Sequence, residues 1–203
     1  MTQIIGVLLA GGESRRFGQP KAFAEYSGKF FWQYSMQALK ETTEHQLIIS
    51  HQNLLERFKE ETEEIVLTDD PKFKGDGPMA GIYTAMKYEI SEWYMILSCD
   101  IPLISAELVH KLQSFISPDK KIIIPNIKGK LHPLVGVYHY SVFPLIERQL
   151  ENKERKMMTL LSQVEVCYVT EKELQTDPKI FCNINSPNDY GMLLNNGKIV
   201  ESE

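Results

Sequence analysis

The chain has 203 residues, of which 43% are hydrophobic and 24% are charged, and its formal net charge is −5. This length suits one α/β domain, and the composition is that of an ordinary globular protein. The negative charge argues against nucleic-acid binding, which requires a basic face, although a local basic cluster could still bind a small anion.

The three cysteines, Cys99, Cys167 and Cys182, are widely spaced and form neither a disulfide framework nor a zinc pattern. They predict a reducing, cytoplasmic setting. The N-terminus lacks the charged segment of a signal peptide, and the apolar runs are too short for a membrane span, so we expect neither feature.

Short apolar runs alternate with amphipathic stretches through the first 118 residues. In chain order they predict a strand at 4–9, a helix at 30–41, a strand at 46–50, a helix at 53–61, a strand at 65–68, a helix at 79–89, a strand at 93–98 and a helix at 106–116. Pro78 and Ser105 stand where helices commonly begin, because proline fits the first turn and serine can cap it. The alternation predicts a mostly parallel sheet with helices on both faces.

The pattern changes after Pro118. Strands are predicted at 121–125 and 134–138, separated by a turn at Gly129 that favours an antiparallel pair. Helices are predicted at 142–151 and 156–162, a strand at 164–170 and a short helix at 187–195. We therefore expect one domain, with a mixed part after residue 118 that completes the site.

A glycine-rich loop follows the first predicted strand. It reads Leu-Ala-Gly-Gly-Glu-Ser-Arg-Arg-Phe-Gly over residues 9–18, and Pro20 and Lys21 come soon after. Adjacent glycines let the backbone turn sharply, and exposed backbone N–H groups in such a turn bind anions. Arg15, Arg16 and Lys21 add positive charge of the kind that a triphosphate needs. The alternative is a glycine-rich turn with solvated arginines, and the loop matches neither a Walker A motif nor a dinucleotide fingerprint.

Two shorter motifs lie at the ends of predicted elements in the middle of the chain. Asp-Gly-Pro-Met-Ala-Gly at 76–81 opens a helix, where small residues let a flat group approach the backbone and free N–H groups bind anions. Ser-Cys-Asp-Ile-Pro at 98–102 ends an apolar strand, and Asp100 at that position suits Mg²⁺. The alternatives are an ordinary loop entering a helix and a helix-capping aspartate.

The last motif, Asn-Ile-Asn-Ser-Pro-Asn-Asp, covers residues 183–189. If the segment is extended, Asn183 and Asn185 point to one face, where their amide groups could bind a phosphate or a metal-bound water. The segment also has the form of a helix start, with Ser186 as the cap and Pro187 in the first turn. The two interpretations are compatible.

In this order and at this spacing, the four motifs resemble those of the molybdenum cofactor guanylyltransferase family, from residue 4 to about residue 194. The resemblance implies a single Rossmann-like α/β nucleotidyltransferase domain with a mostly parallel sheet, helices on both faces and a mixed C-terminal part. Residues 1–118 would be its nucleotide-binding part and residues 119–203 its acceptor-side part. The implied function is transfer of GMP from GTP to a molybdopterin-type molybdenum cofactor, with release of pyrophosphate. Mg²⁺ would be the cofactor, and other molybdenum cofactor biosynthesis proteins would be partners.

By the same resemblance, each motif supplies part of a site. The GTP contacts would be Leu9, Ala10, Gly11, Gly12, Lys21, Asp69, Gly77, Pro78, Gly81 and Asp100. Arg16, Lys21 and Asp100 would be the catalytic residues, with Mg²⁺ on Asp100. Asn183, Asn185 and His132 would lie on the acceptor side. Because Asp70 follows Asp69 directly, the sequence leaves open which of the two contacts the nucleotide.

The choice of base depends on the glycine loop. Relatives that use CTP usually have Leu-Ala-Ala-Gly, whereas this chain has Leu-Ala-Gly-Gly, and the missing methyl group leaves room for a larger base. The implied reaction is attack of a phosphate monoester on the α-phosphorus of GTP. Because that nucleophile is already anionic, catalysis requires alignment and charge neutralisation instead of a strong base.

Alternatives remain open at this point. One is a nucleotidyltransferase that uses CTP or another NTP with a molybdopterin, sugar phosphate or polyol phosphate. Another is a nucleotide-binding regulator without turnover, against which Arg16, Lys21 and Asp100 argue together. The charged run at 153–156 could hold the acceptor phosphate or be a solvated helix start. His132 could be an acceptor contact or simply a packed residue.

Overall fold

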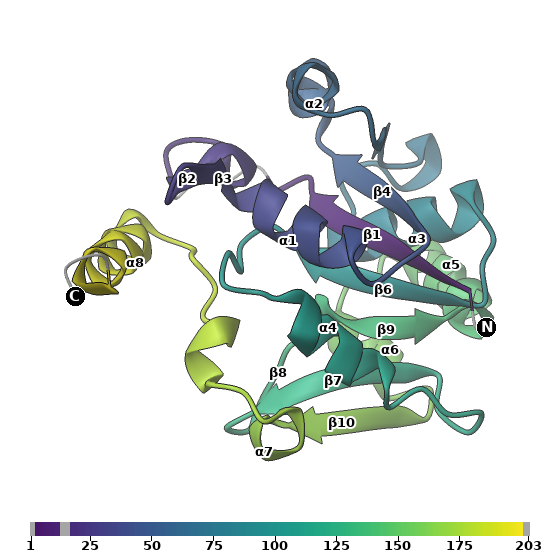
Figure 1. The fold of residues 1–203 in the computed structure, drawn as a ribbon. Coiled ribbons are helices and arrows are strands. Elements are labelled where there is room, and N and C mark those ends of the chain that lie inside the picture. The colour runs from purple at the N-terminus through teal and green to yellow at the C-terminus, as the bar shows by residue number, and fades with distance from the viewer. Residues whose placement is uncertain (1–2, 13–16, 201–203) are drawn as a thin grey trace.

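The computed structural model describes residues 3–12 and 17–200, with side chains through residue 195. Its centre is one sheet in the order β10-β7-β9-β6-β1-β4-β5, with the short strand β8 added to β7 (Figure 1). The strands are β1 (Ile4–Ala10), β4 (His45–Ser50), β5 (Ile65–Thr68), β6 (Trp93–Ser98), β7 (Ile122–Ile127), β8 (Lys130–Leu131), β9 (Val135–His139) and β10 (Val166–Thr170). β1 runs parallel to β4 and β6, β5 to β4 and β10 to β7, whereas β9 is antiparallel to β6 and β7. The predicted mostly parallel sheet is confirmed.

Helices cover both faces of this sheet. They are α1 (Phe31–Lys40), α2 (Leu55–Glu61), α3 (Pro78–Tyr88), α4 (Ala106–Gln113), α5 (Phe143–Glu151), α6 (Met157–Leu161), α7 (Glu171–Leu174) and α8 (Pro187–Val200). Ile4 and Leu8 of β1 belong to the apolar layer shared with α1, α2 and α4, whereas Ile5 and Val7 belong to the layer shared with α3, α5 and α6. This alternation follows from the two-residue period of a strand. Because helices cover β1 and β6 on both faces, their sequences are apolar almost throughout.

Several shorter elements connect or flank the main ones. They are the hairpin of β2 (Glu25–Tyr26) and β3 (Lys29–Phe30) and the 3₁₀ turns Lys21–Phe23, Gln52–Leu54, Pro71–Phe73, Tyr140–Val142 and Pro178–Phe181. α8 lies off the sheet, toward the hairpin (Figure 1). Leu193 of α8 shares a small apolar cluster with Phe17 and Phe31, and the Tyr190 hydroxyl donates to the Glu25 carbonyl at 2.6 Å. The last helix therefore packs against the segment between the glycine-rich loop and α1.

Most predicted elements begin or end within two residues of the predicted bounds, and the clearest differences are at three places. The helix predicted at 106–116 ends at Gln113, because Phe115 and Ile116 donate to carbonyls three residues back and tighten the last turn. The Gly129 turn leads from β7 into β8 and only then into β9; Lys128 and Gly129 both have positive φ, at 49° and 81°, as such a tight turn requires. The final helix continues beyond residue 195 to Val200.

The parallel strands β1, β4, β5 and β6 all end at the same edge of the sheet. Ile184 donates a backbone hydrogen bond of 2.9 Å to the Asp100 carbonyl, which brings the segment before α8 to the end of β6. Residues from both the first 118 positions and the rest of the chain therefore meet at this edge. None of the helices in the described part of the chain has the length and apolar character needed to cross a bilayer.

Candidate active site

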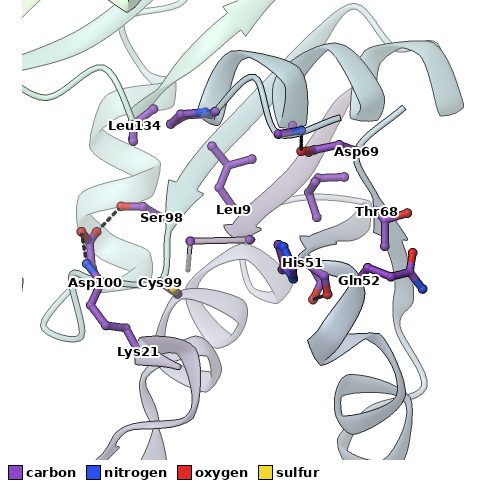
Figure 2. A pocket seen from close by; sticks show the side chains of 18 of the residues that line it. Leu9, Lys21, His51, Gln52, Thr68, Asp69, Ser98, Cys99, Asp100 and Leu134 are labelled. Carbon is purple, nitrogen blue, oxygen red and sulfur yellow. Dashed lines mark hydrogen bonds and ion pairs between the residues drawn. The ribbon is translucent and has the colours of Figure 1, made fainter. Parts of the chain in front are cut away.

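A cavity of about 690 Å³ opens at the carboxyl ends of β1, β4, β5 and β6 (Figure 2). Ligands of open α/β sheets bind at such strand ends, and the volume lies within the range of small-molecule sites. Lys21 and Asp100 lie at one end of the cavity and Thr68 and Asp69 at the other (Figure 2). The lining residues are Leu9, Gly11, Gly12, Lys21, Ile49, Ser50, His51, Gln52, Thr68, Asp69, Lys74, Gly75, Gly77, Pro78, Gly81, Ser98, Cys99, Asp100 and Leu134.

Asp100 is the centre of a hydrogen-bonded cluster at one end of the cavity. Its Oδ2 is 3.3 Å from Lys21 Nζ and accepts a bond of 3.0 Å from Asn183 Nδ2. Its Oδ1 accepts a bond of 2.6 Å from Ser98 Oγ. Lys21 Nζ also donates to Asn185 Oδ1 at 2.8 Å. The side chains of Lys21 and Asp100 are 17% and 16% exposed, so both are shielded from bulk water while facing the cavity.

The two neighbouring aspartates at the other end have different surroundings. Asp69 lines the cavity and accepts the Gly75 backbone N–H at 3.0 Å. Burial raises the pKa of Asp69, and the Gly75 hydrogen bond partly opposes this increase. Asp70 instead caps the 3₁₀ turn through the Lys72 backbone N–H and binds Lys87 Nζ at 2.8 Å, which lowers the pKa of Asp70. Of the pair left open by the sequence, Asp69 is the one placed in the cavity.

Glycines bring backbone close to the cavity at the start of α3 and at the end of β1. Gly77 has a φ of +79°, which favours glycine, and Pro78 follows in the first turn of α3. A Cβ at Gly81 would lie 2.9 Å from Leu9 Cδ2, so glycine at this position lets α3 approach β1. A Cβ at Gly11 would make only ordinary contacts of 3.5 Å with backbone atoms of residues 50 and 51.

Residues 6–166 match the MobA-like NTP transferase domain family. A relative from Geobacillus sp. (strain WCH70), named as a probable molybdenum cofactor guanylyltransferase, is 40% identical over 190 residues, which is 94% of this chain and 97% of that protein. A relative from Bacillus subtilis (strain 168) with the same name is 38% identical over 189 residues, with 93% and 94% of the two chains covered.

The chain belongs to the molybdenum cofactor guanylyltransferase family. It is therefore a nucleotidyltransferase, as its motifs predict. The fold agrees with the crystal structure of molybdopterin-guanine dinucleotide biosynthesis protein A from Archaeoglobus fulgidus, with a TM-score of 0.82 at 22% identity over 98% of this chain and 100% of that one.

Most residues that the guanylyltransferase resemblance assigned to the site do line the cavity. The exceptions among the described residues are Ala10, which is buried at the end of β1, and the acceptor-side residues Asn183, Asn185 and His132. Asn183 and Asn185 nevertheless bond directly to the Asp100–Lys21 pair. Arg16 lies outside the described residues, so its role stays a prediction.

His132 is placed differently from the other predicted acceptor contacts. It is only 7% exposed, and its ring lies 5.1 Å from the ring of Phe181. Burial lowers the pKa of His132 to about 4, which favours a neutral imidazole at neutral pH. These surroundings are those of a packed side chain, and an acceptor contact by His132 stays a prediction.

Several residues that line the cavity of this guanylyltransferase-family chain, at the ends of β4 and β5 and before α3, were not predicted from the sequence. His51 and Gln52 follow β4, Thr68 ends β5, and Lys74 lies on the loop before α3. His51 Nδ1 accepts the Asn53 backbone N–H at 3.2 Å, which orients its ring. The signal that could have found them is their position directly after predicted parallel strands, where side chains gather at one sheet edge.

The residues around Asp100 fit Mg²⁺ better than a transition metal. Mg²⁺ is commonly held by one or two carboxylates together with substrate phosphates and water. The cluster offers one cavity-facing carboxylate, and the amide groups of Asn183 and Asn185 lie beside it. Within the described residues, no group of three or more His, Cys, Asp or Glu side chains is placed to bind a metal ion.

Proposed function

We propose that this protein transfers a GMP unit from GTP to the terminal phosphate of a molybdopterin-type molybdenum cofactor and releases pyrophosphate. The observation that carries the proposal is the Asp100–Lys21 cluster at one end of a cavity that has Asp69 at the other. The names of the family's relatives support the choice of substrates. Delivery of the acceptor by another molybdenum cofactor biosynthesis protein stays a prediction.

The chemistry at the two ends of the cavity supports one orientation for bound GTP. The triphosphate would lie on the glycine-rich loop beside Lys21, whose ammonium group neutralises phosphate charge. The guanine would lie at the Asp69 end, because its N1–H and exocyclic N–H₂ groups are adjacent donors that a carboxylate can accept. Gly77 and Gly81 would flank the base, since neither adds a side chain to the cavity wall.

In the reaction, one P–O bond forms at the α-phosphorus of GTP and another breaks. A terminal phosphate oxygen of the acceptor forms a new bond to that phosphorus, and the bond from it to the β-phosphate oxygen breaks as pyrophosphate leaves. The nucleophile is already an anion, so alignment and charge neutralisation provide the catalysis. Lys21 would neutralise charge on the triphosphate, and Arg16 would add to this from the glycine-rich loop.

Asp100 would hold Mg²⁺, with Asn183 and Asn185 beside it. When bound, this ion would act as a Lewis acid that neutralises the negative charge of the phosphates. The hydrogen bonds from Ser98 and Asn183 orient the carboxylate before substrate arrives. Asn185 orients the Lys21 ammonium group in the same way. A site held in its working geometry loses less free energy to reorganisation during the reaction.

Calorimetry with GTP, CTP, ATP and UTP in the presence of Mg²⁺ tests the proposal. We expect GTP to bind at least about tenfold more tightly than CTP, because Asp69 matches the donors of guanine. Gly11→Ala should fold normally and reduce this preference, since its methyl group narrows the cavity near the end of β4. A preference for CTP would keep the reaction class and overturn the choice of base.

A transfer assay with Asp100→Asn separates an enzyme from a nucleotide-binding regulator. Asparagine keeps the size of the side chain and removes its charge, so we expect kcat to fall on the order of 10²-fold or more with the fold intact. Circular dichroism and thermal unfolding provide the control for folding. Full activity in this variant would overturn the role given to Asp100.

A further inference from the structure

Asp76 is a buried charged residue that the proposed reaction does not use. Its side chain is 7% exposed, although it lies between Gly75 and Gly77, which both line the cavity. Its Oδ1 is 2.5 Å from Arg155 Nη2, and Lys153 Nζ lies 3.9 Å from its Oδ2. The charged run at 153–156 therefore neutralises Asp76 through Arg155, a role that the sequence did not predict.

The loop that carries Asp76 forms the wall at the Asp69 end of the cavity. Gly75 and Gly77 have φ values of +80° and +79°, so the backbone on both sides of Asp76 has a conformation that favours glycine. Gly75 donates to Asp69 Oδ2 at 3.0 Å, and Asp76 donates its backbone N–H to the Phe73 carbonyl at 3.0 Å. Asp76 does not line the cavity; its carboxylate bonds to the connection between α5 and α6 instead.

Other contacts join the elements on either side of this loop to α5. Lys72 Nζ lies 3.1 Å from Glu147 Oε1 and 2.7 Å from Glu151 Oε1. Tyr83 of α3 donates its hydroxyl to Glu147 at 3.1 Å. The Lys72 pairs are exposed, and exposed ion pairs contribute little. Asp76 is the buried partner, and without Arg155 its carboxylate would keep only the longer 3.9 Å contact to Lys153. A buried charge that is so weakly neutralised is costly. The Asp76–Arg155 pair is therefore the contact whose loss would move the loop.

We propose that Arg155 is a positioning residue for the nucleotide: by holding Asp76, it fixes Gly75, Gly77 and the Gly75–Asp69 hydrogen bond where the base binds. The proposal rests on the proposed function, since it assigns this end of the cavity to the guanine of GTP. It also gives the acceptor-side part of the chain a role in the nucleotide site. Without the pair, the wall around the base should shift while the phosphate end, formed by Lys21 and Asp100, stays in place.

The test compares binding of GTP with binding of tripolyphosphate, both with Mg²⁺, by calorimetry. Tripolyphosphate occupies the phosphate end and has no base. For Arg155→Met we expect GTP affinity to fall on the order of tenfold with tripolyphosphate affinity unchanged. In a transfer assay, KM for GTP should rise while kcat stays within about twofold. Asp76→Asn should behave like Arg155→Met, and the double variant should be no worse than either, because the two act as one unit.

Arg148→Met is the matched control. Arg148 is the arginine of α5, and its guanidinium donates to Gln163 Oε1 at 3.0 Å, so we expect GTP affinity to be unchanged. If Asp76→Asn does not fold, Arg155→Met is still sufficient for the test. The arginine side chain is 55% exposed, so we expect its replacement to leave the fold intact. Unchanged GTP affinity in Arg155→Met, or an equal loss of GTP and tripolyphosphate, would overturn the positioning role alone. Failure of the unaltered protein to bind GTP would overturn the proposed function and, with it, this inference.

Discussion

The adjacent residues Asp69 and Asp70 have pKa values that are shifted in opposite directions by their surroundings. The pKa of Asp69 is raised by burial in the cavity wall, whereas the pKa of Asp70 is lowered by its hydrogen bond to Lys87. Asp70 caps the 3₁₀ turn that begins at Pro71 and does not line the cavity, whereas Asp69 does. A carboxylate that is partly desolvated forms stronger hydrogen bonds to a ligand, so the environment of Asp69 suits recognition of a base.

The buried imidazole of His132 makes a prediction about pH and stability. Its pKa is about 4 in the folded chain and 6.5 in the unfolded chain. The unfolded chain therefore binds the proton first as pH falls, so stability present above pH 6.5 is lost as pH falls toward 4. The loss should be about 3 kcal/mol. Urea unfolding of the protein and of His132→Gln at pH 7.5 and pH 4.5 measures it.

His132→Gln should have a weaker dependence of stability on pH than the unaltered protein, because glutamine has no proton to gain in this range. His110→Gln is the control, since His110 is exposed on α4. The change in the free energy of unfolding between pH 7.5 and pH 4.5 should differ between the two variants, whatever their stabilities at pH 7.5. Equal slopes for His132→Gln and the unaltered protein would contradict the buried, neutral state of this imidazole.

At the scale of elements, two helical glycines differ in the space around them: Gly81 is closely packed and Gly191 is open. A Cβ at Gly81 of α3 would lie 2.9 Å from Leu9 Cδ2 and 3.3 Å from Ile49 Cγ2, whereas at Gly191 of α8 it would meet no atom within 4 Å. Gly81→Ala should lower the free energy of unfolding by about 1–3 kcal/mol, because α3 must move off β1. Gly191→Ala should leave it unchanged or raise it by up to about 1 kcal/mol through helix propensity.

Denaturant unfolding of both variants checks this pair of expectations. Nucleotide binding provides a second readout, since Gly81 also lines the cavity and Gly191 does not. Gly81→Ala should weaken GTP binding, and Gly191→Ala should leave it as it is. Equal stability of the two variants would contradict the close packing of α3 against β1 at Gly81.

At the scale of the whole molecule, the site joins segments that are far apart in sequence, so a bound nucleotide should stabilise the fold. GTP with Mg²⁺ at about 100 times its Kd should add about 2.7 kcal/mol, because it binds only the folded chain. For a chain of this length, that corresponds to a rise in Tm of about 5–10 °C. Scanning calorimetry with and without GTP measures the shift.

Removal of the metal is the matching control. EDTA should abolish transfer and reduce the rise in Tm given by GTP, since the phosphates would then be neutralised without Mg²⁺ at Asp100. CTP at the same concentration should give a smaller rise than GTP. An equal rise with and without Mg²⁺ would contradict the metal site proposed at Asp100.

The sequence by itself determined the elements that depend on local patterns. The apolar runs of β1 and β6 predict buried strands, and Ser105 and Ser186 do accept hydrogen bonds at the starts of α4 and α8, as their positions predict. The order and spacing of the four motifs are sufficient to indicate the family. Local periodicity and turn chemistry are sufficient for these features, because both act over only a few residues.

Only the tertiary structure decided which side chains meet. Lys21 is 79 positions from Asp100 and 164 from Asn185, yet its Nζ bonds to both. The choice between Asp69 and Asp70 depended on the direction of one turn, and the partner of Asp76 came from the connection between α5 and α6. Such contacts depend on how strands are ordered and how helices pack, and no local period of the sequence encodes an interaction between groups so far apart along the chain.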